Sequence, residues 1–98
     1  MVPITISELK RLNKENGGHW FDKASMRFFN SEIESKLYAG KFFITSERME
    51  LNDDKRYTIR EVSEGYRINT VGKFQAFGNL DQAILMIKYL LDSNKHRS

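Results

Sequence analysis

An apolar helical stripe close to the C-terminal end of the chain is the strongest constraint on its fold. Asn79 can cap a helix at this point, and Gln82, three residues later, completes the pattern of a capping box. Apolar residues then recur at spacings of three and four residues, which predicts a helix with one face against a core. The stripe consists of Leu80, Ala83, Ile84, Ile87, Leu90 and Leu91.

Three further large side chains of this helix fall outside the stripe. Leu85, Met86 and Tyr89 leave the helix only a narrow polar face. A helix with apolar residues on most of its sides is typical of one that is covered from more than one direction. We therefore expect a second helix or a partner chain to cover it.

Two runs of alternating residues, 56–62 and 66–71, precede the helix and predict a β-hairpin. With Glu64 and Gly65 as a two-residue turn, one face carries Tyr57, Ile59, Ile68 and Thr70, and the other carries Thr58, Arg60, Val62, Arg67, Asn69 and Val71. A three-residue loop would shift the register by one residue and oppose Glu61 to Arg67. The two-residue turn is favoured because it separates apolar from polar side chains more cleanly. Residues 73–77 can add another short strand.

The first half of the chain predicts a helix, an aromatic helical turn and another hairpin. Thr5 and Glu8 form a capping box for the first helix, which residues 16–18 (Asn-Gly-Gly) would end. Asp22 can cap a single helical turn that runs through Phe29. The runs 33–38 and 41–46, separated by Ala and Gly, predict an antiparallel strand pair. The charged stretch 47–55 is expected to be a solvent-exposed loop.

These elements predict one α+β domain over residues 1–98, with residues 1–3 and 93–98 flexible. We expect an antiparallel sheet of about four strands with the N- and C-terminal helices packed on one face, in the order α-β-β-β-β-α. The reason is that helices at both ends of a run of strands can each cover only the apolar side of the sheet. The short stripe of the first helix would then cover the exposed flank of the last helix.

Composition narrows the class of protein more than its function. The 98 residues are 40% apolar and carry a formal net charge of +3, which suits one small domain and permits nucleic-acid contact without requiring it. No apolar run approaches the roughly 18 residues that span a membrane, so no membrane association is expected. The absence of cysteine excludes disulfides and cysteine metal sites, and it fits a cytoplasmic protein.

No motif with catalytic, metal-binding or cofactor-binding chemistry is recognisable. His19 lies near Asp22 but has no second histidine at metal-ligand spacing, so we expect it to be a structural or surface residue. Glu32 and Glu34 share one face of a predicted strand, and a solvated face explains them better than a glycosidase-like carboxylate pair. No serine lies in a nucleophile elbow. We therefore expect no enzymatic activity, no metal and no cofactor.

The candidate site is the outward face of the predicted sheet, interpreted as a nucleic-acid-binding surface. Its residues are Arg60, Arg67, Asn69, Lys73, Gln75 and Lys41. Arginine and asparagine can form bidentate hydrogen bonds to guanine and adenine edges, and a β-ribbon can enter the major groove of DNA. The alternative interpretation is an antiparallel sheet with one solvated face.

Two functions of different classes follow. In the first, the protein binds DNA or RNA through this face, with further contacts from Lys10, Arg11 and Lys14 of the first helix. In the second, it is an inhibitor or adaptor that binds a host protein through an apolar or an acidic surface. The contact residues would then be Leu85, Met86 and Tyr89, or Asp53 and Asp54. A monomer and a homodimer through the C-terminal helix are both compatible with these functions.

Five segments of the chain carry a family resemblance. They are GGHWF at 17–21, MRFFNS at 26–31, FITSE at 43–47, RYTIR at 56–60 and INTVGKFQAF at 68–77. Together they resemble a family of small domains of uncharacterised function that bacteriophages, plasmids and other mobile elements encode. The resemblance implies a mobile-element accessory protein and carries over no catalytic residue. The order of strands before a capped helix is also similar to arm-binding domains of phage integrases and to double-stranded RNA-binding domains, although their basic clusters are missing.

Overall fold

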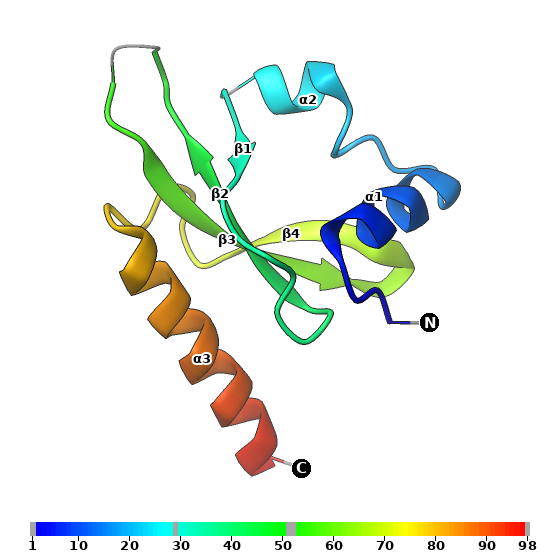
Figure 1. Cartoon of the computed structure of the whole chain (residues 1–98), viewed down its shortest axis with the longest axis vertical. Coiled ribbons are helices and arrows are strands. Elements are labelled where there is room, and N and C mark those ends of the chain that lie inside the picture. The colour runs from blue at the N-terminus through cyan, green and yellow to red at the C-terminus, as the bar shows by residue number, and fades with distance from the viewer. Residues whose placement is uncertain (1, 29, 51–52, 98) are drawn as a thin grey trace.

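The computed structural model describes residues 2–28, 30–50 and 53–97 of the chain. Four antiparallel strands form one sheet in the order β1-β2-β3-β4, with helices on either side of it (Figure 1). The strands are β1 (Glu32–Ile33), β2 (Phe42–Glu47), β3 (Arg56–Ser63) and β4 (Arg67–Val71). The helices are α1 (Ile6–Glu15), α2 (Lys23–Arg27) and α3 (Leu80–Arg97), and a 3₁₀ turn, η1 (Glu64–Tyr66), joins β3 to β4. The predicted α+β class and four-stranded antiparallel sheet are confirmed.

The two long helices begin at the predicted caps. The backbone N–H of Glu8 donates to Thr5 Oγ1 at 3.2 Å, and the N–H of Asp81 donates to Asn79 Oδ1 at 2.7 Å. Each cap satisfies a backbone donor that the first turn of a helix leaves without an intrahelical partner. α1 ends at Glu15, just before the predicted Asn-Gly-Gly stop.

The first hairpin forms at the predicted turn, but its first strand is shorter than predicted. Ala39 and Gly40 both have positive φ, at 54° and 67°, which is the geometry of the primed turns that suit hairpins. Regular β1 pairing stops after Ile33 because the hydroxyl of Ser35 accepts the N–H of Ile44 at 2.8 Å, where a continued strand would offer a backbone carbonyl.

The second hairpin has a three-residue loop, so the predicted two-residue turn is wrong. Tyr66 belongs to the loop, with φ of 59°, and its carbonyl accepts a 2.9 Å hydrogen bond from Asn13 of α1. α1 therefore helps to fix the loop. The register is also not that of the predicted alternative, because Arg67 lies opposite Ser63 rather than Glu61.

This register assigns the side chains to two faces that we call the α1 face and the α3 face. The α1 face carries Phe43, Thr45, Glu47, Thr58, Arg60, Val62, Ile68 and Thr70. The α3 face carries Phe42, Ile44, Tyr57, Ile59, Glu61, Asn69 and Val71. Arg60 thus lies on the opposite face to Asn69, although the predicted register placed them together.

The two terminal helices cover opposite faces of the sheet, so the prediction that they share one face is wrong (Figure 1). Leu9 of α1 packs with Leu37 and Phe43, whereas Ala83 and Ile87 of α3 belong to the other cluster. The reason lies in β2, where three consecutive apolar residues, 42–44, place rings and branched chains on both sides. Both faces therefore need a helix, and each helix has its own core.

The predicted stripe of α3 is confirmed, but α1 does not supply the predicted second cover. Ala83 and Ile87 are fully buried, and the other stripe residues pack around the same core. Leu85 and Tyr89 are 64% and 66% exposed, and Met86 is also exposed. No other helix among the described residues covers this outer side of α3, because α1 lies across the sheet.

Some predictions fall on residues outside the described ranges. These are Phe29 at the end of the predicted helical turn, residues 51–52 of the predicted loop, and residues 1 and 98 of the expected flexible ends. α3 itself extends to Arg97. Among the helices of the described ranges, none combines the length and the apolar character that crossing a membrane requires.

Candidate functional site

A buried ion pair occupies the part of the α1 face that α1 does not cover. Arg60 Nη2 lies 3.2 Å from Glu47 Oε2, and the two residues are 8% and 0% exposed. Taking two charges out of water costs several kcal/mol per ion, so such a pair persists only where further hydrogen bonds support it. The predicted loop 47–55 is wrong at its first residue, because Glu47 ends β2 and points into the protein.

Three threonines supply the supporting hydrogen bonds. Arg60 donates through Nε to Thr45 Oγ1 at 3.1 Å and through Nη1 to Thr70 Oγ1 at 2.6 Å. The hydroxyl of Thr58 donates to Glu47 Oε1 at 2.7 Å. Alternation along the strands brings all five side chains to one face, and among the described residues no buried side-chain nitrogen or oxygen lacks a partner.

The segment after β4 closes over this network as a turn, and the predicted short strand 73–77 is reduced to one antiparallel bridge between Phe77 and Tyr57. Gln75 has φ of 57°, and its backbone N–H donates to Thr58 Oγ1 at 2.8 Å. Its side-chain amide donates to the carbonyl of Glu47 at 3.1 Å. Positive φ costs a non-glycine residue conformational free energy, so these bonds hold Gln75 in place. The turn sets Phe74 beside Arg60.

Aromatic rings flank the Arg60 guanidinium. Its central carbon lies 5.3 Å from the ring centroid of Trp20 and 5.5 Å from that of Phe74. Trp20 is itself fixed by edge-on contacts with Phe21 and Phe43. Cation–π attraction therefore adds to the hydrogen bonds that orient the guanidinium plane.

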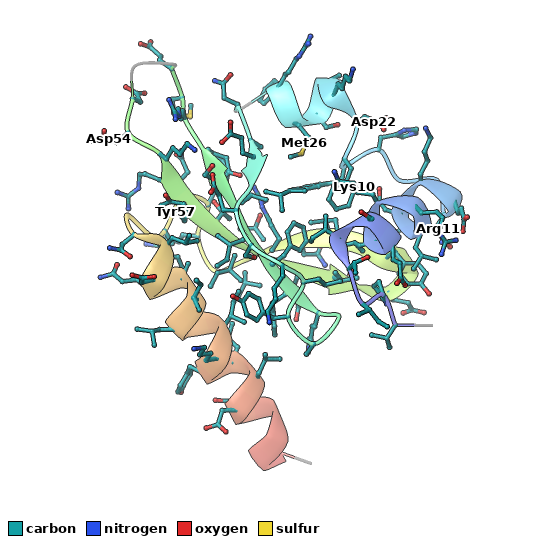
Figure 2. The ribbon with its side chains drawn as sticks, viewed as in Figure 1. Lys10, Arg11, Asp22, Met26, Asp54 and Tyr57 are labelled. Atoms are coloured by element: carbon teal, nitrogen blue, oxygen red, sulfur yellow. The ribbon has the colours of Figure 1, made fainter. Side chains whose placement is uncertain are left out.

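A cavity of about 670 Å³ lies between α2 and this part of the sheet, and we call it the α2 pocket. Its lining residues are Trp20, Ala24, Ser25, Met26, Phe28, Ser31, Arg60, Thr70 and Phe74. Met26 points from α2 toward the sheet (Figure 2). The walls are largely aromatic and aliphatic, and the floor has a few convergent polar groups, which is the usual composition of a ligand site.

A second cavity of about 390 Å³ adjoins the α2 pocket, because Met26 and Ser31 line both. Lys23, Arg27 and Arg48 also line it, and we call these three residues the basic rim. The one carboxylate in its lining, Glu32, is already partnered by Lys55 at 2.9 Å. The hydrogen bond from Lys55 holds the pKa of Glu32 below its usual range, with a smaller contribution from Arg48.

Comparison with known proteins assigns the chain to a family. A family model matches residues 5–88. The chain belongs to DUF7447, a family of unknown function. No curated protein and no solved structure matches the chain. The DUF7447 match runs from the cap of α1 into α3, so it includes every residue that lines the α2 pocket.

The six predicted site residues of this DUF7447 chain do not form one exposed face. Arg60 is buried in the ion pair, and Gln75 braces the turn above it. Arg67 and Asn69 are exposed on the α3 face, across the sheet from Arg60. Lys41 Nζ lies 3.7 Å from Oε2 of Glu61, a residue of the α3 face. Lys73 is exposed in the turn after β4. The single continuous surface expected from the sequence is therefore wrong.

Most residues of the α2 pocket could not be predicted from the sequence as members of a site. Phe28 lies in the predicted aromatic helical turn and Trp20 just before it, with no local sign of a cavity, and Glu47 lies in the predicted loop 47–55. A signal was present in the two strands: Thr58 and Arg60 alternate with the apolar residues Tyr57 and Ile59, and Thr45 and Glu47 are likewise two residues apart, with Ser46 between them. Polar residues at every second position of two paired strands indicate a polar patch on one face.

The other candidate groups lie at the surface. His19 Nδ1 is 3.0 Å from Asp22 Oδ2, and both side chains are exposed. Asp22 makes this contact and does not form a side-chain cap for α2. Glu32 and Glu34 both bind Lys55, and Glu32 is exposed, whereas Glu34 is partly buried and also accepts from the Ser46 hydroxyl. Within the described ranges, no three His, Asp or Glu side chains are grouped as a metal site would need.

Proposed function

We propose that this DUF7447 protein is a non-catalytic accessory protein that binds nucleic acid through the α2 pocket and the basic rim. The observation that supports the proposal is the adjacency of an aromatic-walled cavity to three basic side chains. Aromatic rings stack on bases, and lysine and arginine neutralise phosphates, so proteins that bind nucleic acid combine the two features. The site differs from the sheet face expected from the sequence, because that face is divided by the register of β3 and β4.

We further propose a genetic origin and a cellular compartment for the protein. The five segments that resemble mobile-element domains support an accessory protein of a bacteriophage, plasmid or related element. The absence of cysteine is compatible with a role in the cytoplasm, where such a protein would meet nucleic acid.

The test is the binding of fluorescein-labelled 20-nucleotide DNA and RNA, single-stranded and duplex, followed by anisotropy at several salt concentrations. We expect binding at about 50 mM salt that weakens steeply as salt rises. The double change Lys23→Ala and Arg27→Ala should lower the slope of log affinity against log salt by about 1.4 for a single strand, because each lost phosphate contact removes about 0.7. Both positions are exposed, so the fold should persist.

The matched control is the double change Arg67→Ala and Lys88→Ala. It removes the same charge from exposed positions on the β4 hairpin and on α3, away from the α2 pocket. Binding should change by less than about twofold, since exposed substitutions outside a contact have small effects. Equal losses in both double variants, or loss only on changing Lys10, Arg11 and Lys14 of α1, would contradict the proposed site. No binding to any of the four probes would contradict the function.

A second candidate function is contact with another protein through the outer side of α3. Leu85 and Tyr89 are 64% and 66% exposed there, and exposed apolar residues that gather on one helix face favour a protein interface. The partner would be a host protein or a second copy of this chain. Light scattering after size exclusion tests the homodimer, and capture from host lysate with and without nuclease separates a protein partner from one tethered by nucleic acid.

A further inference from the structure

We infer that the ligand is a single-stranded nucleic acid, one base of which enters the α2 pocket while an adjacent phosphate lies at the basic rim. The inference rests on the proposed function and names the form of nucleic acid that the site takes. It follows from three properties of the site, which are the charge of the pocket floor, the nature of its walls and the position of the rim.

The floor of the α2 pocket favours a neutral ligand group over a phosphate. Arg60 provides the only positive charge in the lining, and Glu47 lies 3.2 Å from its Nη2. The carboxylate offsets the guanidinium charge, so an anion placed there would gain little from Arg60. Ser25, Ser31 and Thr70 line the same pocket; the Ser25 hydroxyl also donates to the carbonyl of His19, and the Thr70 hydroxyl accepts from Arg60. Hydroxyls can both donate and accept, which suits the polar edge of a base.

The walls favour a flat ring. Trp20, Phe28 and Phe74 contribute three aromatic side chains to a lining of nine residues, and Phe28 is 77% exposed. Rings of this kind stack on nucleobases whatever the sequence, because every base has a π-face. A base in a duplex is already stacked and paired, so its entry would require unpairing and rotation out of the helix. The pocket therefore selects strands whose bases are free.

The basic rim supplies the charge that the floor lacks. Lys23 and Arg27 project from α2, whose residues Ala24, Ser25 and Met26 line the α2 pocket. The two cavities share Met26 and Ser31, so a ligand that occupies both contacts residues of α2 in each cavity. A nucleotide has this arrangement of a neutral ring beside an anionic phosphate. The charge complementarity makes a single strand a better fit than a neutral apolar peptide.

The only tryptophan of the chain, Trp20, lines the pocket and reports on its occupancy. The probes are a 12-nucleotide single strand of thymidine, a 12-base-pair duplex, and a 12-residue strand of abasic sites with the same phosphates. We expect the thymidine strand to quench Trp20 fluorescence and to bind about tenfold more tightly than either other probe at the same salt concentration. The abasic strand should bind through its phosphates without quenching.

The variant Phe28→Ala should weaken binding of the thymidine strand about tenfold and leave the abasic strand unaffected. Tyr89→Ala, a comparably exposed aromatic position on α3, is the matched control and should leave both affinities unchanged. Equal binding of duplex and single strand without quenching would overturn base insertion and leave the proposed function standing. No binding of any probe would overturn both. Quenching by an acidic, tyrosine-containing peptide but by no oligonucleotide would overturn the inference in favour of a protein ligand.

Discussion

At the scale of single residues, Arg60 shows how burial changes the role of a side chain. In the sequence it is one of two arginines on an alternating strand, and the pattern predicts that it contacts nucleic acid. In the structure its donors bind Thr45, Thr70 and Glu47, and two aromatic rings flank it. It therefore shapes the floor of the α2 pocket and is not free to follow a phosphate backbone.

We predict that Arg60→Met destabilises the protein by about 3–5 kcal/mol, because it leaves the fully buried Glu47 carboxylate without its cation. Adding Glu47→Leu should recover most of this loss, since apolar residues of similar volume often replace a buried ion pair without a net cost. Urea denaturation of both variants provides the free energies of unfolding. A loss below about 1 kcal/mol for Arg60→Met would show that the pair is more hydrated than its burial indicates.

At the scale of elements, α3 has two sides with different roles. Its inner side packs on Phe42, Ile44 and Ile59 of the sheet, and Ile87 is fully buried among them. Its outer side exposes Leu85 and Tyr89 to solvent. Apolar residues around most of the circumference therefore reflect one buried side and one exposed apolar side, and not a helix enclosed within the domain.

We predict that Ile87→Ala lowers the free energy of unfolding by about 2–5 kcal/mol, the range for removing a fully buried aliphatic side chain. Leu85→Ala, two residues away on the exposed side, should change it by no more than about 0.5 kcal/mol. Thermal and urea unfolding of the two variants measure the difference. Similar losses at both positions would mean that the outer side of α3 is buried in solution, as it would be in a homodimer.

At the scale of the whole molecule, one sheet separates two cores. Neighbouring residues of β2 serve different cores, with Phe43 on the α1 face and Phe42 and Ile44 on the α3 face. If either helix detached, it would expose one side of β2, whose other side packs in the second core. We therefore expect the domain to unfold as one cooperative unit, as small single domains usually do.

This cooperativity can be measured with two probes that report on different sides of the sheet. Trp20 lies in the α1-face cluster, whereas the far-UV signal is dominated by helices, of which α3 with 18 residues is the longest among the described residues. We predict that the two signals give the same melting temperature, and that Ile87→Ala lowers both together. A Trp20 transition that stays in place while the helical signal melts earlier would indicate two independently unfolding units.

Several elements could be predicted from the sequence because their signals are local. The caps at Thr5 and Asn79, the stripe of α3 and the turn at Ala39 and Gly40 all depend on residues within a few positions of each other. Backbone hydrogen bonding and helical periodicity specify such features without distant partners. The α+β class followed from their order.

The face that each helix covers and the position of the site depend on contacts between residues that are distant in the sequence. Residues 42–44 of β2 are apolar on both sides, so no local pattern chooses a face for either helix. The register of β3 and β4 depends on Tyr66, which α1 holds in the loop through Asn13. Because side chains alternate along a strand, this shift of one residue placed Asn69 across the sheet from Arg60 and brought Thr70 to Arg60 in its place.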